Sequence, residues 1–371
     1  MGGVGMETYK LSDLCEILDA KRKPLSALQR AKKQGIYPYY GAQGIIDHLD
    51  EYLLDGEYLL VAEDGANLDT RNQPIANIAK GKIWVNNHAH VLGSNGKFPL
   101  NLLGFILNNM NISPYVTGCA QPKLNQENLR NIEIELPSHI DSIASILSSL
   151  DRKIELNNKI NADLEEMAQA IFKNWFVDFE PFKDGKFVDS ELGMIPEGWK
   201  VGTLGELCNF KRGKNLLTKN AIDEGVPVVA GGLEPSCYHN VANTGAPVIT
   251  VSGSGANAGF MRMYHVPVWA SDCSFIDISC ENFYFVYCFL KVNSKLLKHA
   301  QTGAVQPHVK PSDIHDFELV IPDKESIFDF QDKVKPFFEK IASIQKENSR
   351  LSLLRDTLLP RLMSGEIEVP D

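Results

Sequence analysis

The sequence lacks any apolar run of 18 or more residues, the length that a membrane-spanning helix requires. It also lacks a recognisable secretory signal, because MGGVGMETYK contains no basic region followed by an apolar core. Seven cysteines are present, but none are spaced C-x-x-C, which argues against a zinc site or a disulfide framework. We therefore expect a cytoplasmic protein with free thiols. The cysteines expected to be small buried residues are Cys15, Cys119, Cys208, Cys273 and Cys288.

Catalytic motifs are missing as well. We find no G-x-x-x-x-G-K-[ST] loop for ATP, no H-E-x-x-H or Cys/His ladder for a metal, no Gly-x-Ser-x-Gly elbow and no Asn/Asp-Pro-Pro-aromatic run for methyl transfer. The glycines of PVITVSGSGANAGF (247–260) lack the βαβ context of a dinucleotide site, so a turn is the better interpretation. His88 and His90 have no acidic or Cys partner at ligand spacing, which favours turn or strand histidines. The sequence predicts a chain that is not a catalyst by itself.

Basic residues are outnumbered by acidic ones, 37 to 47, which gives a net charge of −10. That balance argues against nucleic-acid binding through bulk charge. Residues 138–195 alone hold 6 basic and 11 acidic side chains, or −5 of the −10. The two large blocks, 6–137 and 196–322, are near neutral at −2 and −1, which is compatible with a local basic face on either.

What the sequence does contain is an internal repeat. GCAQPKLNQENLRNIEIELP (118–137) and GAVQPHVKPSDIHDFELVIP (303–322) share Gly-x-x-Gln-Pro, a short polar run and an alternating apolar stretch closed by Pro. YKLSDLCEI (9–17) parallels GTLGELCNF (202–210). Gly-Ala-Asn and tryptophan segments recur between these landmarks in the same order. The chain is therefore a duplication.

Each copy shows short strands between Gly, Asn, Asp and Pro turns, with short helices between them. The expected strands include 58–62, 82–85, 248–251 and 266–269, and the expected helices include 99–108 and 283–298. NIEIELP and DFELVIP are expected to be final strands, preceded by an Asn125 helix cap in the first copy and by Pro311 at a helix start in the second. Each copy is predicted to be an α+β domain.

Two long heptad patterns follow the two copies. The residues expected at the interface between the resulting helices are Leu147, Leu150, Ile154, Asn157, Asn161, Leu164, Ile171, Ile341, Ile344, Asn348, Leu351 and Leu358. Asn161 and Asn348 occupy equivalent places, where a buried Asn would fix the register. Pro336 is expected to end or kink the second helix. The alternative is that each helix packs only on its own domain.

The predicted fold class is α+β, with two pseudo-symmetric globular domains separated by two long antiparallel coiled-coil helices. The predicted segments are a first domain, a first spacer helix, a junction, a second domain and a second spacer helix, at 6–137, 138–177, 178–198, 199–322 and 323–365.

At this point the residues resemble a known family. FKNWFVDFEPFKDGKFVDSELGMIPEGWKVGTLGEL (172–207) is similar to the central junction of type I restriction-modification specificity subunits. LLPRLMSGEI (358–367) is similar to the end of that family's second conserved helix, and the Gly-x-x-Gln-Pro segments resemble the ends of its target-recognition domains. The resemblance covers nearly the whole chain in the family's order.

The resemblance implies a non-catalytic specificity subunit that binds a bipartite double-stranded DNA site, with one target-recognition domain for each half. It implies two methyltransferase subunits as partners, which use S-adenosylmethionine to methylate adenine, and ATP-dependent restriction subunits. S-adenosylmethionine, ATP and Mg are then expected in those partners, with no cofactor or metal in this chain.

Polar residues of the turns are the candidate DNA contacts, because Arg can bind guanine with two hydrogen bonds and Lys more often contacts phosphate. The candidates are Lys21, Arg22, Lys23, Arg71, Lys80, Lys82, Gln121, Lys123, Lys211, Arg212, Lys214, Arg262, Gln306, His308 and Lys310. For each, the alternative is a solvated surface charge or a turn-stabilising amide. Asn67 and Asn257 recur in both copies and are interpreted as turn formers. Gln121 and Gln306 also recur, so specificity is expected beside them, at Lys123 and His308.

Two other functions stay open at this stage. One is a solitary or phase-variable specificity protein without a restriction partner. The other is a self-contained DNA methyltransferase, against which the missing catalytic motif argues. The recognised DNA sequence does not follow from these residues.

Overall fold

The computed structural model describes residues 5–118, 121–137, 140–255, 257–301, 307–364 and 366–367. The chain forms two compact units, Met1–Ile154 with Ser349–Asp371, and Glu155–Asn348. Each unit contains one mixed α and β domain and part of two long helices, α6 (Ile140–Phe176) and α10 (Lys324–Met363). The predicted two-domain architecture with mixed helix and strand content is confirmed.

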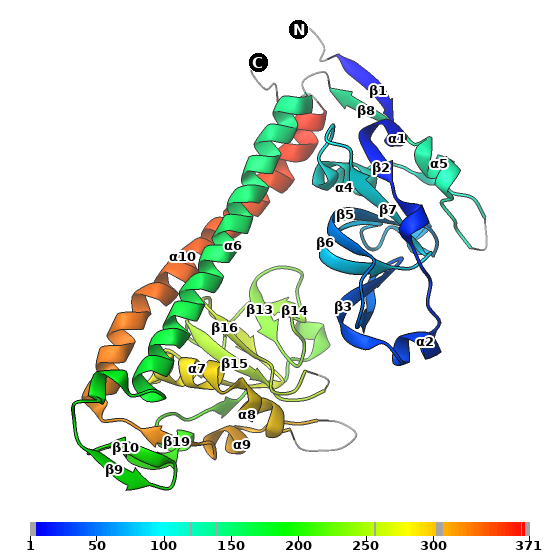
Figure 1. Cartoon of the computed structure of the whole chain (residues 1–371). Coiled ribbons are helices and arrows are strands. Elements are labelled where there is room, and N and C mark those ends of the chain that lie inside the picture. Colours follow the sequence, from blue (N-terminus) through cyan, green and yellow to red (C-terminus); the bar gives the residue numbers. More distant parts are fainter. Residues whose placement is uncertain are drawn as a thin grey trace. The chain divides into compact units, whose positions relative to one another are not determined.

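The first domain is built on a six-stranded sheet with the order β2-β7-β5-β6-β3-β4 (Figure 1). A separate two-stranded sheet pairs β1 with β8 antiparallel. The strands of this domain are β1 (Met6–Lys10), β2 (Cys15–Ile17), β3 (Gln34–Gly41), β4 (Gly44–Leu49), β5 (Leu54–Ala62), β6 (Ala76–Val85), β7 (Ala89–Ser94) and β8 (Glu133–Pro137). Its helices and 3₁₀ turns are α1 (Leu11–Leu14), η1 (Asp19–Lys21), α2 (Ala27–Ala31), α3 (Asn67–Thr70), α4 (Leu100–Asn109), η2 (Ser113–Tyr115) and α5 (Gln126–Arg130).

The core of the first domain lies between this sheet and α4. Leu103 and Leu107 of the helix are fully buried, as are Leu59 and Leu92 of the sheet. Gly104 permits the close approach, because a Cβ at that position would lie 2.8 Å from Cδ1 of Leu59. The predicted strands 58–62 and 82–85 and the helix predicted at 99–108 are confirmed within β5, β6 and α4.

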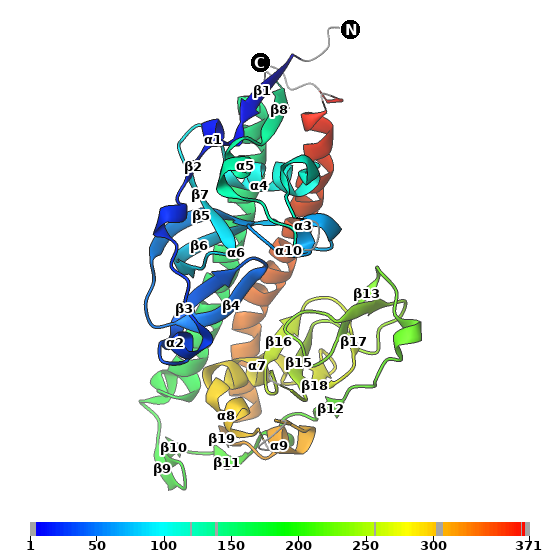
Figure 2. The same cartoon turned by 90° about the vertical axis from the view of Figure 1, so that its right-hand side faces the viewer.

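The second domain has a four-stranded sheet, β12-β18-β15-β16, and a three-stranded sheet, β14-β13-β17 (Figure 2). β11 pairs antiparallel with β19. The strands are β11 (Lys200–Thr203), β12 (Lys211–Arg212), β13 (Val226–Val229), β14 (Cys237–His239), β15 (Val248–Ser252), β16 (Met261–Tyr264), β17 (Trp269–Ala270), β18 (Cys273–Asp277) and β19 (Glu318–Ile321). The helices and 3₁₀ turns are η4 (Leu204–Glu206), η5 (Thr218–Asn220), α7 (Phe283–Val292), α8 (Ser294–His299) and α9 (Pro311–His315).

Two of the predicted elements in this domain differ from the structure. The helix expected over 283–298 is broken at Asn293, whose backbone (φ −103°, ψ 35°) leaves the helical region and whose side chain donates to the carbonyl of Phe289. The strand expected over 266–269 is reduced to Trp269–Ala270. β15 is confirmed; all five of its residues are buried because it lies between β18 and β16.

The internal repeat is visible in matching contacts inside each domain. The thiol of Cys15 donates to Leu11 O (3.4 Å), and that of Cys208 donates to Leu204 O (3.5 Å). β8 and β19 confirm the predicted final strands, and each pairs with the first strand of its domain. The Asn125 cap is confirmed by its bond from the Asn128 amide (2.8 Å), and Pro311 begins α9.

The cysteine prediction is confirmed at four of its five positions. Cys15, Cys208, Cys273 and Cys288 are buried and free, and burial raises the pKa of the Cys15 thiol to about 12. Cys119 lies outside the described residues. Thiols that stay protonated in an apolar interior are poor nucleophiles, which fits a packing role.

The junction between α6 and the second domain is an aromatic cluster. It contains a 3₁₀ turn, η3 (Glu180–Phe182), and a hairpin of β9 (Phe187–Ser190) and β10 (Gly193–Pro196). The ring of Trp199 contacts those of Phe176, Phe179 and Phe182, with centroids 4.7–5.8 Å apart. The Trp199 indole also donates to Asp323, next to the start of α10 (2.8 Å).

α6 and α10 pack antiparallel within each unit. In the second unit, Phe172 lies against Phe330 (ring centroids 5.6 Å apart), and Asn157 donates to Asn348 (2.8 Å). In the first unit, Arg355 forms an ion pair with Asp151 (2.8 Å). None of the twelve residues predicted at the helix interface is exposed.

The two helices pack on the domains as well as on each other. Ile143 and Leu147 belong to the core of the first domain, and Phe172 and Phe330 to that of the second. The helices therefore contact each other, and the alternative that each packs only on its own domain is wrong. The helix does not end at Pro336 but continues to Met363, so the expected end at that residue was wrong.

Replacing Asn157 with alanine should destabilise the second unit by about 1–3 kcal/mol, because its buried amide donates to both Asn348 and Glu347 (2.8 and 2.9 Å). Asn158→Ala is the matched control, since Asn158 is exposed and only accepts a bond from Asn348. Urea unfolding of both variants measures the difference. Equal losses would show that the Asn157 bonds contribute nothing beyond helix propensity.

Candidate nucleic-acid interface

The same two loops meet in each domain, and they are the loops that carry the repeated motifs. In the first domain, Asp64 forms an antiparallel bridge with Lys123, and the Gly65 amide donates to Pro122 O (3.2 Å). In the second domain, Ser254 bridges His308, and the Gly255 amide donates to Pro307 O (3.1 Å). In both domains, the residues at the repeated Pro therefore lie beside the first glycine of the Gly-Ala-Asn turn.

Shared residues build this pair of loops. Gly118 has φ +87°, and a Cβ there would lie 2.6 Å from Gln121 O, so the turn requires glycine. Asn67 is buried and exchanges two hydrogen bonds with the backbone of Gln73 (2.7 and 2.9 Å), which confirms its prediction as a turn former. Asn257 also lies in a turn, since its carbonyl accepts from the Phe260 amide (2.9 Å).

A tryptophan fixes a third, basic loop beside them. The Trp84 indole donates to Lys23 O (2.7 Å), and the Trp269 indole donates to Lys214 O (2.8 Å). The two lysines are therefore at equivalent positions, and both are exposed. The sequence placed both basic clusters among the candidates, and the structure places each beside the paired loops of its own domain.

In the first domain the candidate arginine is used inside the protein. Arg22 forms ion pairs with Asp19 (3.2 Å) and Glu63 (2.5 Å) and donates to Ala89 O (2.9 Å). Its side chain is only 15% exposed. These contacts are those of a scaffold residue, and the predicted contact of Arg22 with DNA gains no support from them.

A buried histidine completes this network. His90 is fully buried, with Nδ1 2.6 Å from Asp19 Oδ2 and Nε2 2.7 Å from Leu124 O. The ring therefore links the Asp19 carboxylate of η1 to a backbone carbonyl inside the domain. His90 is thus a strand histidine, as expected, but with a buried carboxylate partner that the sequence did not indicate.

The carboxylates of the network are held ionised. Burial alone would raise the pKa of Asp19, but the hydrogen bond and charge of His90, the Val91 amide and Arg22 outweigh it and lower the pKa. Burial likewise opposes ionisation of Glu63, while Arg22, His90 and Lys123 lower its pKa. Lys123 lies 3.2 Å from Glu63, so this network reaches a predicted specificity position.

Asp19, Glu63 and His90 were not predicted as site residues. Their pairing depends on contacts 41–71 residues apart in sequence, between η1, the end of β5 and β7. The sequence held a weak indication of their role. Asp19 lies two residues before the basic cluster that begins at Lys21, and Glu63 lies two residues before the Gly-Ala-Asn turn.

In the second domain a different polar cluster occupies the same place. Arg212 forms an ion pair with Asp272, which also accepts a hydrogen bond from Ser254. These side chains line an open pocket of about 550 Å³ together with Gly213, Asn215 and His308. Equivalent loops therefore present Asp64 and Lys123 in one domain, and Ser254 and His308 in the other.

Arg262, on β16, lies away from those loops. It forms two parallel hydrogen bonds with Glu234 (3.1 Å each) and lies 5.7 Å from the ring centroids of Phe260 and Tyr264. The bonds from Arg262 lower the pKa of Glu234. Its guanidinium is thus already bound by a carboxylate in the absence of DNA.

The remaining predicted contacts fall into three groups. Arg71 donates to the carbonyls of Leu107 and Met110, and so caps α4. Lys80 pairs with Glu57, and Lys82 lies 4.8 Å from the Tyr52 ring centroid. The third group consists of other exposed side chains, Lys21, Lys23, Gln121, Lys211, Lys214 and Lys310, while Gln306 lies outside the described residues.

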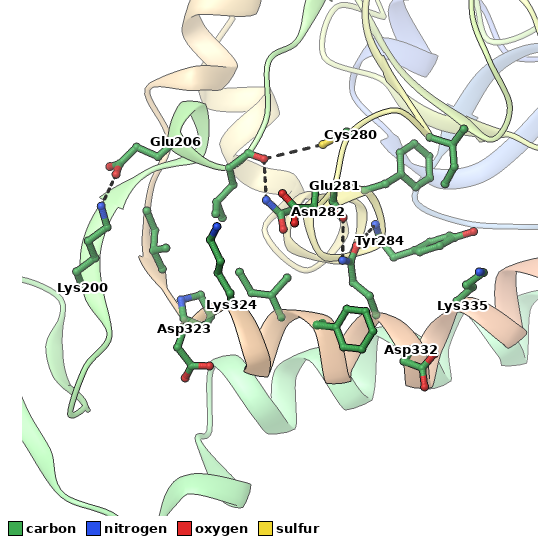
Figure 3. A pocket seen from close by; sticks show the side chains of 18 residues that line it. Lys200, Glu206, Cys280, Glu281, Asn282, Tyr284, Asp323, Lys324, Asp332 and Lys335 are labelled. Carbon is green, nitrogen blue, oxygen red and sulfur yellow. Dashed lines mark hydrogen bonds and ion pairs between the residues drawn. The ribbon is translucent and has the colours of Figure 1, made fainter.

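A larger pocket, of about 830 Å³, lies beside the start of α10 (Figure 3). Its wall includes the ion pair of Lys200 with Glu206 and the exposed ring of Phe328. None of the predicted DNA contacts lines it.

No three His, Cys, Asp or Glu side chains in the described part of the chain are arranged to hold a metal ion. Across the same residues, none of the helices has an apolar stretch sufficient to cross a membrane.

Comparison with known proteins identifies the family. The model of the type I restriction modification DNA specificity domain matches residues 3–166 and 196–352, one match for each half of the duplication. The chain belongs to this family. It is therefore a specificity-domain protein, as the resemblance implied.

Individual relatives agree. The chain is 32% identical over 280 residues to the MjaIX specificity subunit of Methanocaldococcus jannaschii, a match that covers 68% of this chain and 65% of that relative. It is 27% identical over 336 residues to the HindI specificity subunit of Haemophilus influenzae, covering 66% and 71%. The structure of an S subunit from Mycoplasma genitalium superposes with a TM-score of 0.52 at 19% identity, covering 100% of this chain and 98% of that one, which shows the shared fold.

Proposed function

We propose that this protein is the DNA-reading specificity subunit of a type I restriction-modification complex and binds a bipartite double-stranded site, one half with each domain. The observation that carries the proposal is the pair of equivalent loops with different side chains. A common scaffold presents Asp64 and Lys123 in the first domain but Ser254 and His308 in the second. Two readers built on one scaffold need conserved turns and divergent contact residues.

We propose further that α6 and α10 act as an antiparallel coiled-coil spacer between the two half-sites. A helix of 37 residues is about 55 Å long at 1.5 Å per residue. That length corresponds to about one and a half turns of B-DNA. It suits two half-sites with unread base pairs between them.

The partners we propose are two adenine methyltransferase subunits and ATP-dependent restriction subunits, in the cytoplasm. The names of the relatives support this, since they are specificity subunits of type I restriction enzymes. S-adenosylmethionine, ATP and Mg would be bound by those partners. The sequence supports that division, because it contains no motif for any of the three.

Methylome sequencing tests the proposed function. A host that expresses the chain with its methyltransferase partner should show a split motif with a methylated adenine in each half. Exchanging residues 199–322 for the second domain of a relative should change one half of the motif and leave the other half unchanged. One continuous motif, or a change in both halves, would contradict two independent readers.

Two control reactions separate the alternatives. The purified chain, incubated with DNA and labelled S-adenosylmethionine, should transfer no methyl group; transfer without a partner would establish a self-contained methyltransferase. Methylation without restriction of unmodified DNA in the same host would indicate a specificity protein without a restriction partner.

A further inference from the structure

The backbone on both sides of Arg212 is held in place. Arg212 lies on β12 opposite Ser274 of β18, and the next two amides donate to Cys273 O (2.8 Å) and Ala270 O (2.9 Å). Gly213 passes so close to the Ser271 carbonyl that a Cβ there would collide with it. These backbone contacts therefore fix the position of the Arg212 Cα atom, from which the side chain extends.

The guanidinium itself packs against a glycine. A Cβ at Gly253 would lie 3.1 Å from Cζ of Arg212 and closer still to Nη1. Gly253 is anchored by its own backbone, with its amide donating to Asp272 O and its carbonyl accepting from the Val309 amide (3.1 Å each). Because glycine has no side chain, the Arg212 guanidinium can occupy the space beside residue 253.

Asp272 then holds one end of the guanidinium. One carboxylate oxygen accepts from Nη2 of Arg212, and the other accepts from the Ser254 hydroxyl. Arg212 is still 46% exposed and lines the open pocket beside His308. A guanidinium has five N–H donors, so donors are left over for a ligand in that pocket.

We propose that Arg212 binds a guanine of the second half-site through O6 and N7, and that Asp272 and Gly253 are positioning residues for this contact. The inference rests on the proposed function. Guanine presents two acceptors in the major groove that match the planar fork of arginine. A guanidinium already oriented by a carboxylate loses less freedom on binding. Because the pair is formally neutral, it is poorly suited to a phosphate, which favours a base contact.

The first domain cannot make the same contact. When Gly65 is aligned with Gly255, Glu63 takes the position of Gly253. When Lys23 is aligned with Lys214, a lysine, Lys21, takes the position of Arg212. The proposed guanine contact is therefore specific to the second half-site, and the first half-site is an internal control in the same molecule.

The test uses the complex of this chain with its methyltransferase partner and DNA libraries randomised in one half-site at a time. Arg212→Ala should lower the preference for guanine at one position of the second half-site by about 10- to 100-fold. Gly253→Ala should relax the same position, because the group it displaces is the tip of a flexible side chain and not backbone. Asp272→Asn should relax that position too, and Asp272→Glu, which keeps the carboxylate, should recover part of the preference.

The control variant is Lys295→Ala, which removes an exposed positive charge from α8. It should change no base preference. A uniform loss of affinity for all sequences by Arg212→Ala, with a salt slope smaller by about one, would show a phosphate contact and overturn the proposal. Unchanged base preferences in both Arg212→Ala and Gly253→Ala would also overturn it, while the proposed function would stand. A wild-type complex without sequence-specific binding would instead refute the proposed function itself.

Discussion

Phe330→Ala should destabilise the second unit by about 3–5 kcal/mol, the largest effect that we expect from a single truncation in this protein. Phe330 is fully buried, and its ring lies 5.2 Å from that of Phe176 and 5.6 Å from that of Phe172. Truncation would leave a cavity where α6, α10 and the second domain meet, and close-packed aromatic rings refill such a cavity poorly.

The matched control lies two residues away on the same helix. Phe328 is 67% exposed, and Phe328→Ala should change the free energy of unfolding by no more than about 0.5 kcal/mol. Chemical unfolding followed by tryptophan fluorescence measures both variants, since Trp175 and Trp199 belong to or pack against the cluster around Phe330. Similar losses for the two variants would show that Phe330 is not part of a packed core in solution.

His90→Ala should destabilise the first domain by about 3–5 kcal/mol, because it removes one partner from a buried group of charges. Asp19 would lose the ring nitrogen that lies 2.6 Å away and would stay buried. The control is His88→Ala, which breaks the more exposed pair with Asp64 (2.7 Å) and should cost less than about 1 kcal/mol. Thermal unfolding of the two variants gives the comparison, and equal costs would contradict a charged core around His90.

The same network predicts a dependence of stability on pH. The folded-state pKa values of Asp19 and Glu63 are lowered, so their contribution is complete above the unfolded values near about pH 4. This contribution to stability is lost as the pH falls from the unfolded-state pKa values towards the lower pKa values of the folded protein. Asp19→Asn should therefore reduce the slope of unfolding free energy against pH below about pH 4. Acid titrations of the wild type and the variant, followed by circular dichroism, measure it, and identical slopes would contradict the lowered pKa of Asp19.

Much of the fold followed from local pattern. Alternating apolar residues in NIEIELP and DFELVIP predicted β8 and β19, and heptad spacing predicted two long helices. The wrong expectations concerned single residues. Pro336 did not end its helix, because the tertiary packing of α10 outweighs the loss of one backbone hydrogen bond. Asn293 divided a helix that the apolar pattern had shown as continuous.

The candidate site was predicted less well, for a physical reason. Residue type indicates that an arginine can bind a base but not whether a carboxylate of the same protein already binds it. Arg22, Arg212 and Arg262 look alike in the sequence, yet the first is used inside a charged core, the second lines an open pocket and the third is paired with Glu234 between two rings. Those partners lie 28–60 residues away along the chain, beyond the range of any local pattern.

The sequence by itself determined the duplication, the α+β character of each copy, the two long helices and the family. Repeats, periodicity and extended motifs can be recognised from the order of the residues alone. Only the tertiary structure showed that the repeated Pro of each final loop lies against the first glycine of the Gly-Ala-Asn turn, with Lys123 facing Asp64 and His308 facing Ser254. Only the tertiary structure placed Arg212 on Gly253 beside Asp272. Such contacts depend on strands paired across long stretches of chain, and the side chains that share a surface are fixed by that pairing.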